Sequence, residues 1–126
     1  MDYVIDREDR IVLVKIGPSD SGEATTESLL ALGEAEPDLW TWDCIIHVPV
    51  VAQDASVEQV SRAARQYATQ KGVRATTVFV SDDAYLHLWA KVMDFQFPPR
   101  KHLVVRDLAT ARELIFSRRP GKMNRK

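Results

Sequence analysis

Residues 42–48 are Trp42-Asp43-Cys44-Ile45-Ile46-His47-Val48. This run in the middle of the chain is nearly all apolar and does not alternate with polar side chains. A strand that is buried on both of its faces has this pattern, which is typical of parallel sheets covered by helices. The run therefore predicts a fully buried strand of an α/β domain.

Strands and helices alternate on either side of this run. Segments 3–6 and 11–17 are rich in β-branched residues and flank a short polar turn, which predicts a β-hairpin. Helices are predicted at 23–35, 56–71, 81–95 and from Asp107 onward, and strands at 75–80 and 102–105. The order β-β-α-β-α-β-α-β-α predicts an α/β fold with a mixed, mainly parallel five-stranded sheet and four helices.

The length of 126 residues suits one domain, which we expect over residues 1–117. Residues 118–126 are basic and are expected to form a disordered tail. The tail carries no aromatic residue that could stack on bases, so no nucleic-acid partner is expected. No apolar run is long enough to span a membrane and no signal peptide precedes the first strand, which favours a cytoplasmic location.

The net charge of −1 hides an asymmetry between the two halves of the chain. Residues 1–60 hold 13 acidic and 3 basic side chains, whereas residues 61–126 hold 5 acidic and 14 basic ones. The two halves could present separate charged surfaces for association, or they could interleave in the fold so that the charges mix.

Metal and thiol chemistry find little support in the sequence. His47, His87 and His102 are scattered and do not form ligand pairs at short spacing, so no metal site is expected. Cys44 is the single cysteine, which excludes an internal disulfide, and its place in the apolar run predicts an inert buried thiol.

Catalytic motifs are also missing. Gly17 and Gly22 precede the first helix without forming a phosphate-binding motif, and no nucleophile elbow occurs. The pair Asp82-Asp83 stands at a helix start, where capping explains it better than acid–base catalysis. We therefore expect neither an enzyme nor a cofactor.

Ser56 begins the sequence Ser56-Val57-Glu58-Gln59, which matches a capping box. The pattern predicts that Ser56 caps the helix that follows. A phosphate on this serine would also gain from the free N–H groups at a helix start, so Ser56 is a candidate phospho-acceptor as well.

The helix at 81–95 has more apolar positions than one buried stripe requires. Part of it is expected to contact a partner protein or a second copy in a homodimer, with Tyr85, Trp89 and Met93 as candidate interface residues. The alternatives are that the helix is packed within one chain or lines a pocket.

A distinctive series of segments lies between residues 72 and 114: Val78-Phe79-Val80, Ser81-Asp82-Asp83, Trp89 and Met93, Val105-Arg106-Asp107 and Ala111-Arg112-Glu113-Leu114. With this series, the chain resembles the SpoIIAA-like superfamily, which contains the STAS domains and is sometimes grouped with Sec14-like lipid carriers. The order of elements agrees over residues 3–116.

This resemblance implies a small α/β domain that binds proteins or ligands and does not catalyse a reaction. Anti-sigma factor antagonists of the superfamily are phosphorylated on a serine at the start of the helix after the central strand. Ser56 stands near that position, although the chain has Gln53-Asp54-Ala55-Ser56 in place of the family motif. The expected function is a non-enzymatic regulatory or protein-interaction module, with a carrier or sensor for an apolar small molecule or lipid as the alternative.

Overall fold

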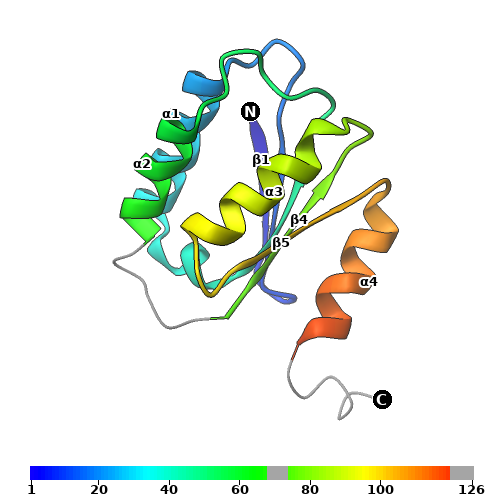
Figure 1. The fold of residues 1–126 in the computed structure, drawn as a ribbon. Helices are drawn as coiled ribbons and strands as arrows, with labels where there is room; N and C mark the ends of the chain where they lie inside the picture. The colour runs from blue at the N-terminus through cyan, green and yellow to red at the C-terminus, as the bar shows by residue number, and fades with distance from the viewer. Residues whose placement is uncertain (68–73, 120–126) are drawn as a thin grey trace.

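The computed structural model describes residues 1–67 and 74–119 and has an α/β architecture (Figure 1). Five strands form one sheet in the order β1-β2-β3-β4-β5. Their bounds are Asp2–Asp6, Ile11–Lys15, Asp43–His47, Thr76–Val80 and Lys101–Val105. β1 pairs antiparallel with β2, and every other pair is parallel. The predicted fold class, with its order of strands and helices, is confirmed.

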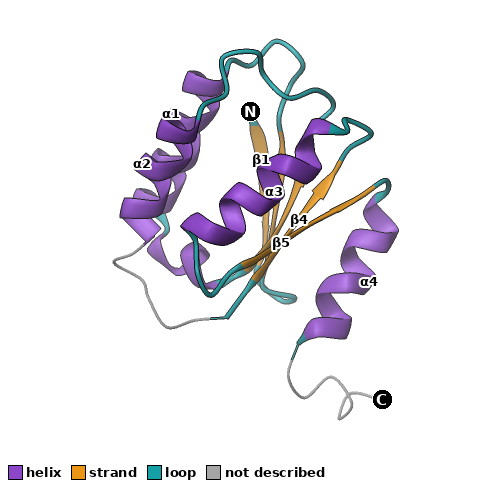
Figure 2. Cartoon of the chain, viewed as in Figure 1, coloured by secondary structure: helices purple, strands orange, loops and turns teal. Residues whose placement is uncertain are grey.

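The sheet is covered by helices on both faces (Figure 2). The helices are α1 (Gly22–Ala35), α2 (Val57–Tyr67), α3 (Tyr85–Gln96) and α4 (Leu108–Arg118). The first three lie on one face of the sheet, and α4 lies alone on the other (Figure 2). A short 3-10 helix, η1 (Pro37–Thr41), follows α1 where the sequence predicted only a break. Residues 68–71 of the predicted second helix lie outside the described residues.

Two hydrophobic clusters result, one on each face of the sheet. Ile46 belongs to the cluster beneath α1, α2 and α3, while Ile45 belongs to the cluster beneath α4. Successive side chains of a strand point to opposite faces, so a strand buried on both faces needs apolar residues at consecutive positions. The predicted double burial of residues 42–48 is confirmed by this arrangement.

Asp43 ties the end of α4 to the start of the parallel strands. Its Oδ1 accepts a hydrogen bond from the Thr76 backbone N–H at 2.7 Å, and its Oδ2 pairs with Arg119 Nε at 2.7 Å. α4 therefore continues to Arg118, and Arg119 has a specific partner, two residues beyond the expected end of the domain at residue 117. The rest of the expected tail, residues 120–126, lies outside the described residues.

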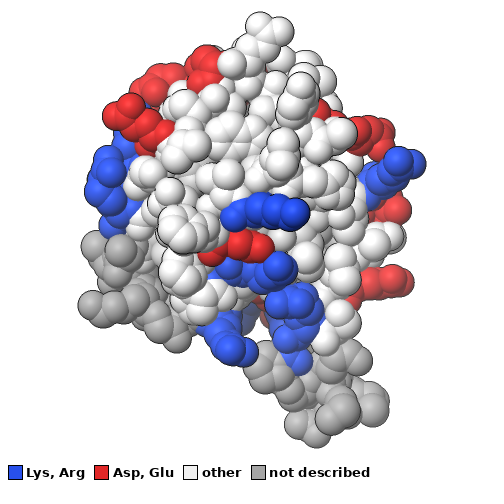
Figure 3. Space-filling view, viewed as in Figure 1, with Lys and Arg blue, Asp and Glu red and all other residues white. Residues whose placement is uncertain are grey.

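The acidic first half and the basic second half of the chain mix in the fold. Arg62 pairs with Glu23 at 3.1 Å and Glu27 at 2.7 Å, and Arg112 pairs with Asp9 at 2.7 Å. Figure 3 shows acidic and basic side chains next to one another at the edge formed by α1 and α2. In these pairs the two halves of the chain interleave, so their opposite charges meet in the fold.

None of the helices in the described residues combines the length and the apolar character that a membrane crossing requires.

Gly33 lies inside α1 and is buried against the indole ring of Trp40. A Cβ at this position would overlap the ring atoms of Trp40. The close approach of η1 to α1 therefore depends on the missing side chain. Trp40 in turn packs against Tyr67 of α2, with ring centroids 6.0 Å apart.

Gly33→Ala tests this contact, because helix propensity and the contact with Trp40 predict changes of opposite sign in the free energy of unfolding. Helix propensity alone would stabilise the variant by about 1 kcal/mol. Because the new methyl group meets a packed indole, we expect a net loss of about 1–3 kcal/mol in the free energy of unfolding, measured with urea. In a Trp40→Ala background the same substitution should be neutral or stabilising; a loss of equal size in both backgrounds would refute the contact.

Candidate functional site

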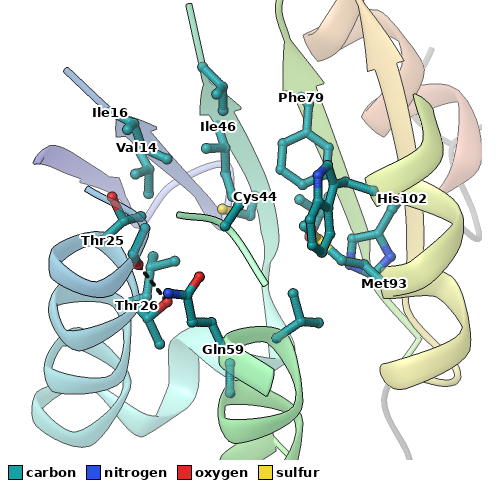
Figure 4. A pocket seen from close by; sticks show the side chains of 18 of the residues that line it. Val14, Ile16, Thr25, Thr26, Cys44, Ile46, Gln59, Phe79, Met93 and His102 are labelled. Carbon is teal, nitrogen blue, oxygen red and sulfur yellow. Dashed lines mark hydrogen bonds between the residues drawn. The ribbon is translucent and has the colours of Figure 1, made fainter. Parts of the chain in front are cut away.

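A cavity of about 270 Å³ lies between the sheet and helices α1, α2 and α3. Val14, Ile46 and Phe79, from three neighbouring strands, form part of its floor, and Met93 of α3 lies beside it (Figure 4). Its lining runs from Val51, beyond the end of β3, to residues near the start of the parallel strands. Most of the lining side chains are apolar.

Several of the residues that the facing helices contribute to the lining are small. α1 contributes Gly22, Thr25 and Thr26, and α2 contributes Ala63 to the lining. Large side chains at these positions would fill the space by interdigitating, as core residues normally do. The volume is close to the lower end of the range for small-molecule sites, about 300–1,000 Å³.

One end of the cavity is polar. Cys44, Thr77 and His102 occupy the same register position on β3, β4 and β5, so they form a row across the sheet on the cavity side. The thiol of Cys44 faces the cavity, out of bulk solvent, and this burial raises its pKa to about 12. The thiol therefore stays protonated, in agreement with the prediction that it is inert.

His102 is buried and held by the carboxylate of Asp94. Its Nδ1 lies 3.0 Å from Asp94 Oδ1, and its backbone N–H donates to the same oxygen at 2.7 Å. Burial lowers the pKa of His102 to about 4, and the charge of Arg100 adds to this effect, while Asp94 opposes it. The ring is therefore neutral near pH 7, with Nδ1–H donating to Asp94 and Nε2 left as an acceptor.

Arg100 precedes β5 and lines the same end of the cavity. Its guanidinium donates to Thr77 Oγ1 at 2.8 Å and to the backbone carbonyls of Trp40 and Trp42 at 2.8 and 2.7 Å. It also stands over the ring of Tyr67, 5.8 Å from the centroid. These contacts hold a positive charge in a fixed position beside the row of Cys44, Thr77 and His102.

The other two histidines, for which no metal site was expected, lie away from the cavity. His47 pairs in register with Lys15 on the α4 side of the sheet, and His87 is exposed on α3. In residues 1–67 and 74–119, no group of three or more His, Cys, Asp or Glu side chains is arranged to hold a metal ion. Backbone N–H groups at the start of α1 are bound by Ser21 and Asp54.

The predicted helix caps are present. Ser56 Oγ accepts from the Gln59 N–H at 3.3 Å, and Gln59 Oε1 accepts from the Ser56 N–H at 3.0 Å, which is the reciprocal pair of a capping box. Asp83 accepts from the Tyr85 N–H at the start of α3 and from the Val51 N–H, and these bonds lower the pKa of its carboxyl group. Phosphorylation of Ser56 stays a prediction.

The three candidate interface residues point in different directions. Trp89 and Met93 line the cavity and pack against the core, whereas Tyr85 is 68% exposed. Leu88 and Phe95, which the sequence did not single out, are 62% and 83% exposed on the same helix. A contact between α3 and a partner stays a prediction, now with Tyr85, Leu88 and Phe95 as its accessible residues.

Sequence reasoning missed the polar end of the cavity. Thr77 and His102 stand in apolar strands, where a polar residue on a buried face is a usable signal, but their alignment depends on strand register. Nothing in the sequence pattern marks Arg100, because its two carbonyl partners lie 58 and 60 residues earlier in the chain.

Comparison of the chain with models of protein families, with curated proteins and with solved structures finds no match.

Removal of the Ser56 cap gives a direct stability test. Ser56→Ala should lower the free energy of unfolding by about 1 kcal/mol, because the N–H of Gln59 loses its acceptor. Ser56→Asp should retain stability, since aspartate is an equally good cap. Urea unfolding curves of both variants would check this; equal losses for Ala and Asp would show that the cap does not stabilise α2.

The buried His102 predicts a pH dependence of stability. The unfolded chain takes up a proton on this imidazole as the pH falls below about 6.5, whereas the folded protein does not until about pH 4. Stability should therefore fall with pH across this window, by about 2 kcal/mol between pH 7 and pH 5. His102→Gln should show a flatter profile in urea unfolding, with His87→Gln as the control at an exposed position. If the free energy of unfolding of His102→Gln fell with pH as steeply as that of the wild type, His102 would not be the source of the pH dependence.

Proposed function

We propose that this chain is a non-enzymatic binding module that takes an apolar small molecule into the cavity beneath α1, α2 and α3. The observation that carries the proposal is the cavity itself, about 270 Å³ in volume and lined mainly by apolar side chains. Apolar cavities of this kind bind apolar ligands, because water finds few partners in them. The polar row of Cys44, Thr77 and His102, with Arg100 beside it, would fix the orientation of the ligand.

An unfilled cavity in the core lowers the stability of the fold. Atoms that line an unfilled space lose dispersion contacts, which costs stability. A ligand that restores these contacts would stabilise the folded chain in proportion to its occupancy. The resemblance to the SpoIIAA-like superfamily agrees with a binding role of this kind.

A regulatory role is supported by helix α3, which lines the cavity on one side and exposes apolar side chains on the other. Trp89 and Met93 face the cavity, while Tyr85, Leu88 and Phe95 are exposed on the same helix. A ligand that packs against the inner side would bias the position of the outer side. We therefore favour a sensor whose exposed helix contacts a protein partner over a carrier that only transports its ligand.

Binding of a neutral apolar dye tests the proposal. N-phenylnaphthylamine should bind with a rise in fluorescence, and Ala63→Leu should weaken that binding by about tenfold or more, because the larger side chain occupies the cavity. Ala31→Leu, at an exposed position on α1, is the matched control and should bind like the wild type.

Thermal unfolding should show that Ala63→Leu remains folded. Equal dye binding by Ala63→Leu and wild type, or no binding by either folded protein, would refute the proposed function.

A further inference from the structure

Arg100 is a buried cation without a carboxylate partner in the part of the chain that the structure describes. Arg100 is only 9% exposed. Its guanidinium donates three hydrogen bonds, all to neutral oxygens: the Thr77 hydroxyl and the backbone carbonyls of Trp40 and Trp42. Residues 68–73 and 120–126 contain no aspartate or glutamate. Buried charges are normally paired, because an isolated one loses its hydration without compensation.

Two acids near this end of the cavity, Asp94 of α3 and Asp43 of β3, are already engaged. Asp94 pairs with Lys101 at 2.9 Å and holds His102, and Asp43 pairs with Arg119 at 2.7 Å. Neither forms an ion pair with Arg100. The polar end of the cavity is therefore positively charged near pH 7, since His102 is neutral and Cys44 is protonated.

Some N–H groups of the Arg100 guanidinium are also not used in hydrogen bonds within the protein. It carries five N–H groups, and three hydrogen bonds are formed within the described residues, which leaves two without a protein acceptor. Thr77 accepts from Arg100 through Oγ1, so its own hydroxyl hydrogen is free to donate. The carbonyls of Trp40 and Trp42 and the ring of Tyr67 hold the guanidinium in place before any ligand arrives.

We infer that the ligand of the cavity is an amphipathic monocarboxylate, whose apolar body lies against Val14, Ile46 and Phe79 and whose carboxylate binds Arg100 and the hydroxyl of Thr77. This inference rests on the proposed function. Both Nη2 hydrogens are engaged, so one carboxylate oxygen would accept from the free N–H of Nη1 and the other from the Thr77 hydroxyl, which matches the single charge and two oxygens of a carboxylate. A phosphate monoester brings nearly two charges and more acceptor oxygens than this end of the cavity can satisfy.

Competition against bound N-phenylnaphthylamine separates the head groups at constant chain length. At neutral pH, decanoate should displace the dye at a concentration about tenfold or more below that needed for decanol or methyl decanoate, and decylamine should be the weakest competitor. Decanol or the methyl ester competing as well as decanoate would overturn the inference while leaving the cavity as an apolar site. Failure of the dye to bind the wild type would overturn both proposals.

Charge variants assign the preference to Arg100. Arg100→Gln should bind the dye but lose the preference for decanoate over decanol, and Arg100→Lys should retain part of it. Lys91→Gln, which removes a charge at an exposed position of α3, should keep the wild-type preference. Circular dichroism checks the fold of each variant. If Arg100→Gln is unfolded, the wild-type comparison of decanoate with decanol decides the inference alone; a folded Arg100→Gln that still prefers decanoate would overturn it.

Discussion

The double burial of β3 is the constraint on which the rest of this structure depends. Ile45 and Ile46 are adjacent in the chain, point to opposite faces of the sheet, and are both almost entirely removed from solvent. Each face must therefore be covered by helices. The two faces are covered differently, because α4 alone packs against one while α1, α2 and α3 share the other (Figure 2). The single helix packs closely through Ala111 and Ile115, whereas the three helices leave a cavity above the strands.

The pairing of the strands determines which side chains the cavity presents to a ligand. Parallel pairing of β3, β4 and β5 aligns Cys44, Thr77 and His102 at one end of the cavity, and the next row toward the strand ends is apolar. A molecule in this space would meet a gradient from an apolar floor to a fixed positive charge at Arg100. Neutral His102 and protonated Cys44 leave that charge uncompensated. The same arrangement would discriminate an acid from an alcohol of equal length without any catalytic group.

Local patterns in the sequence were enough to predict the order of the elements, the doubly buried strand and the capping box of Ser56 and Gln59. Each depends on residues that are close together in the chain. The short helix Pro37–Thr41 was missed, because its place depends on the contact of Trp40 with Gly33 and Tyr67. The polar end of the cavity was missed for a similar reason, since it is assembled by strand register and by bonds from Arg100 to carbonyls of distant residues. Periodicity also did not separate the inner residues Trp89 and Met93 from the exposed Tyr85.

The most direct test of the central claim is a crystal structure of the protein with decanoate. The account predicts that the alkyl chain lies between Ile46 and Met93 and that the carboxylate is within hydrogen-bond distance of the Arg100 guanidinium and the Thr77 hydroxyl. A cavity closed by repacked side chains, or decanoate bound only on the outer surface of α3, would contradict it.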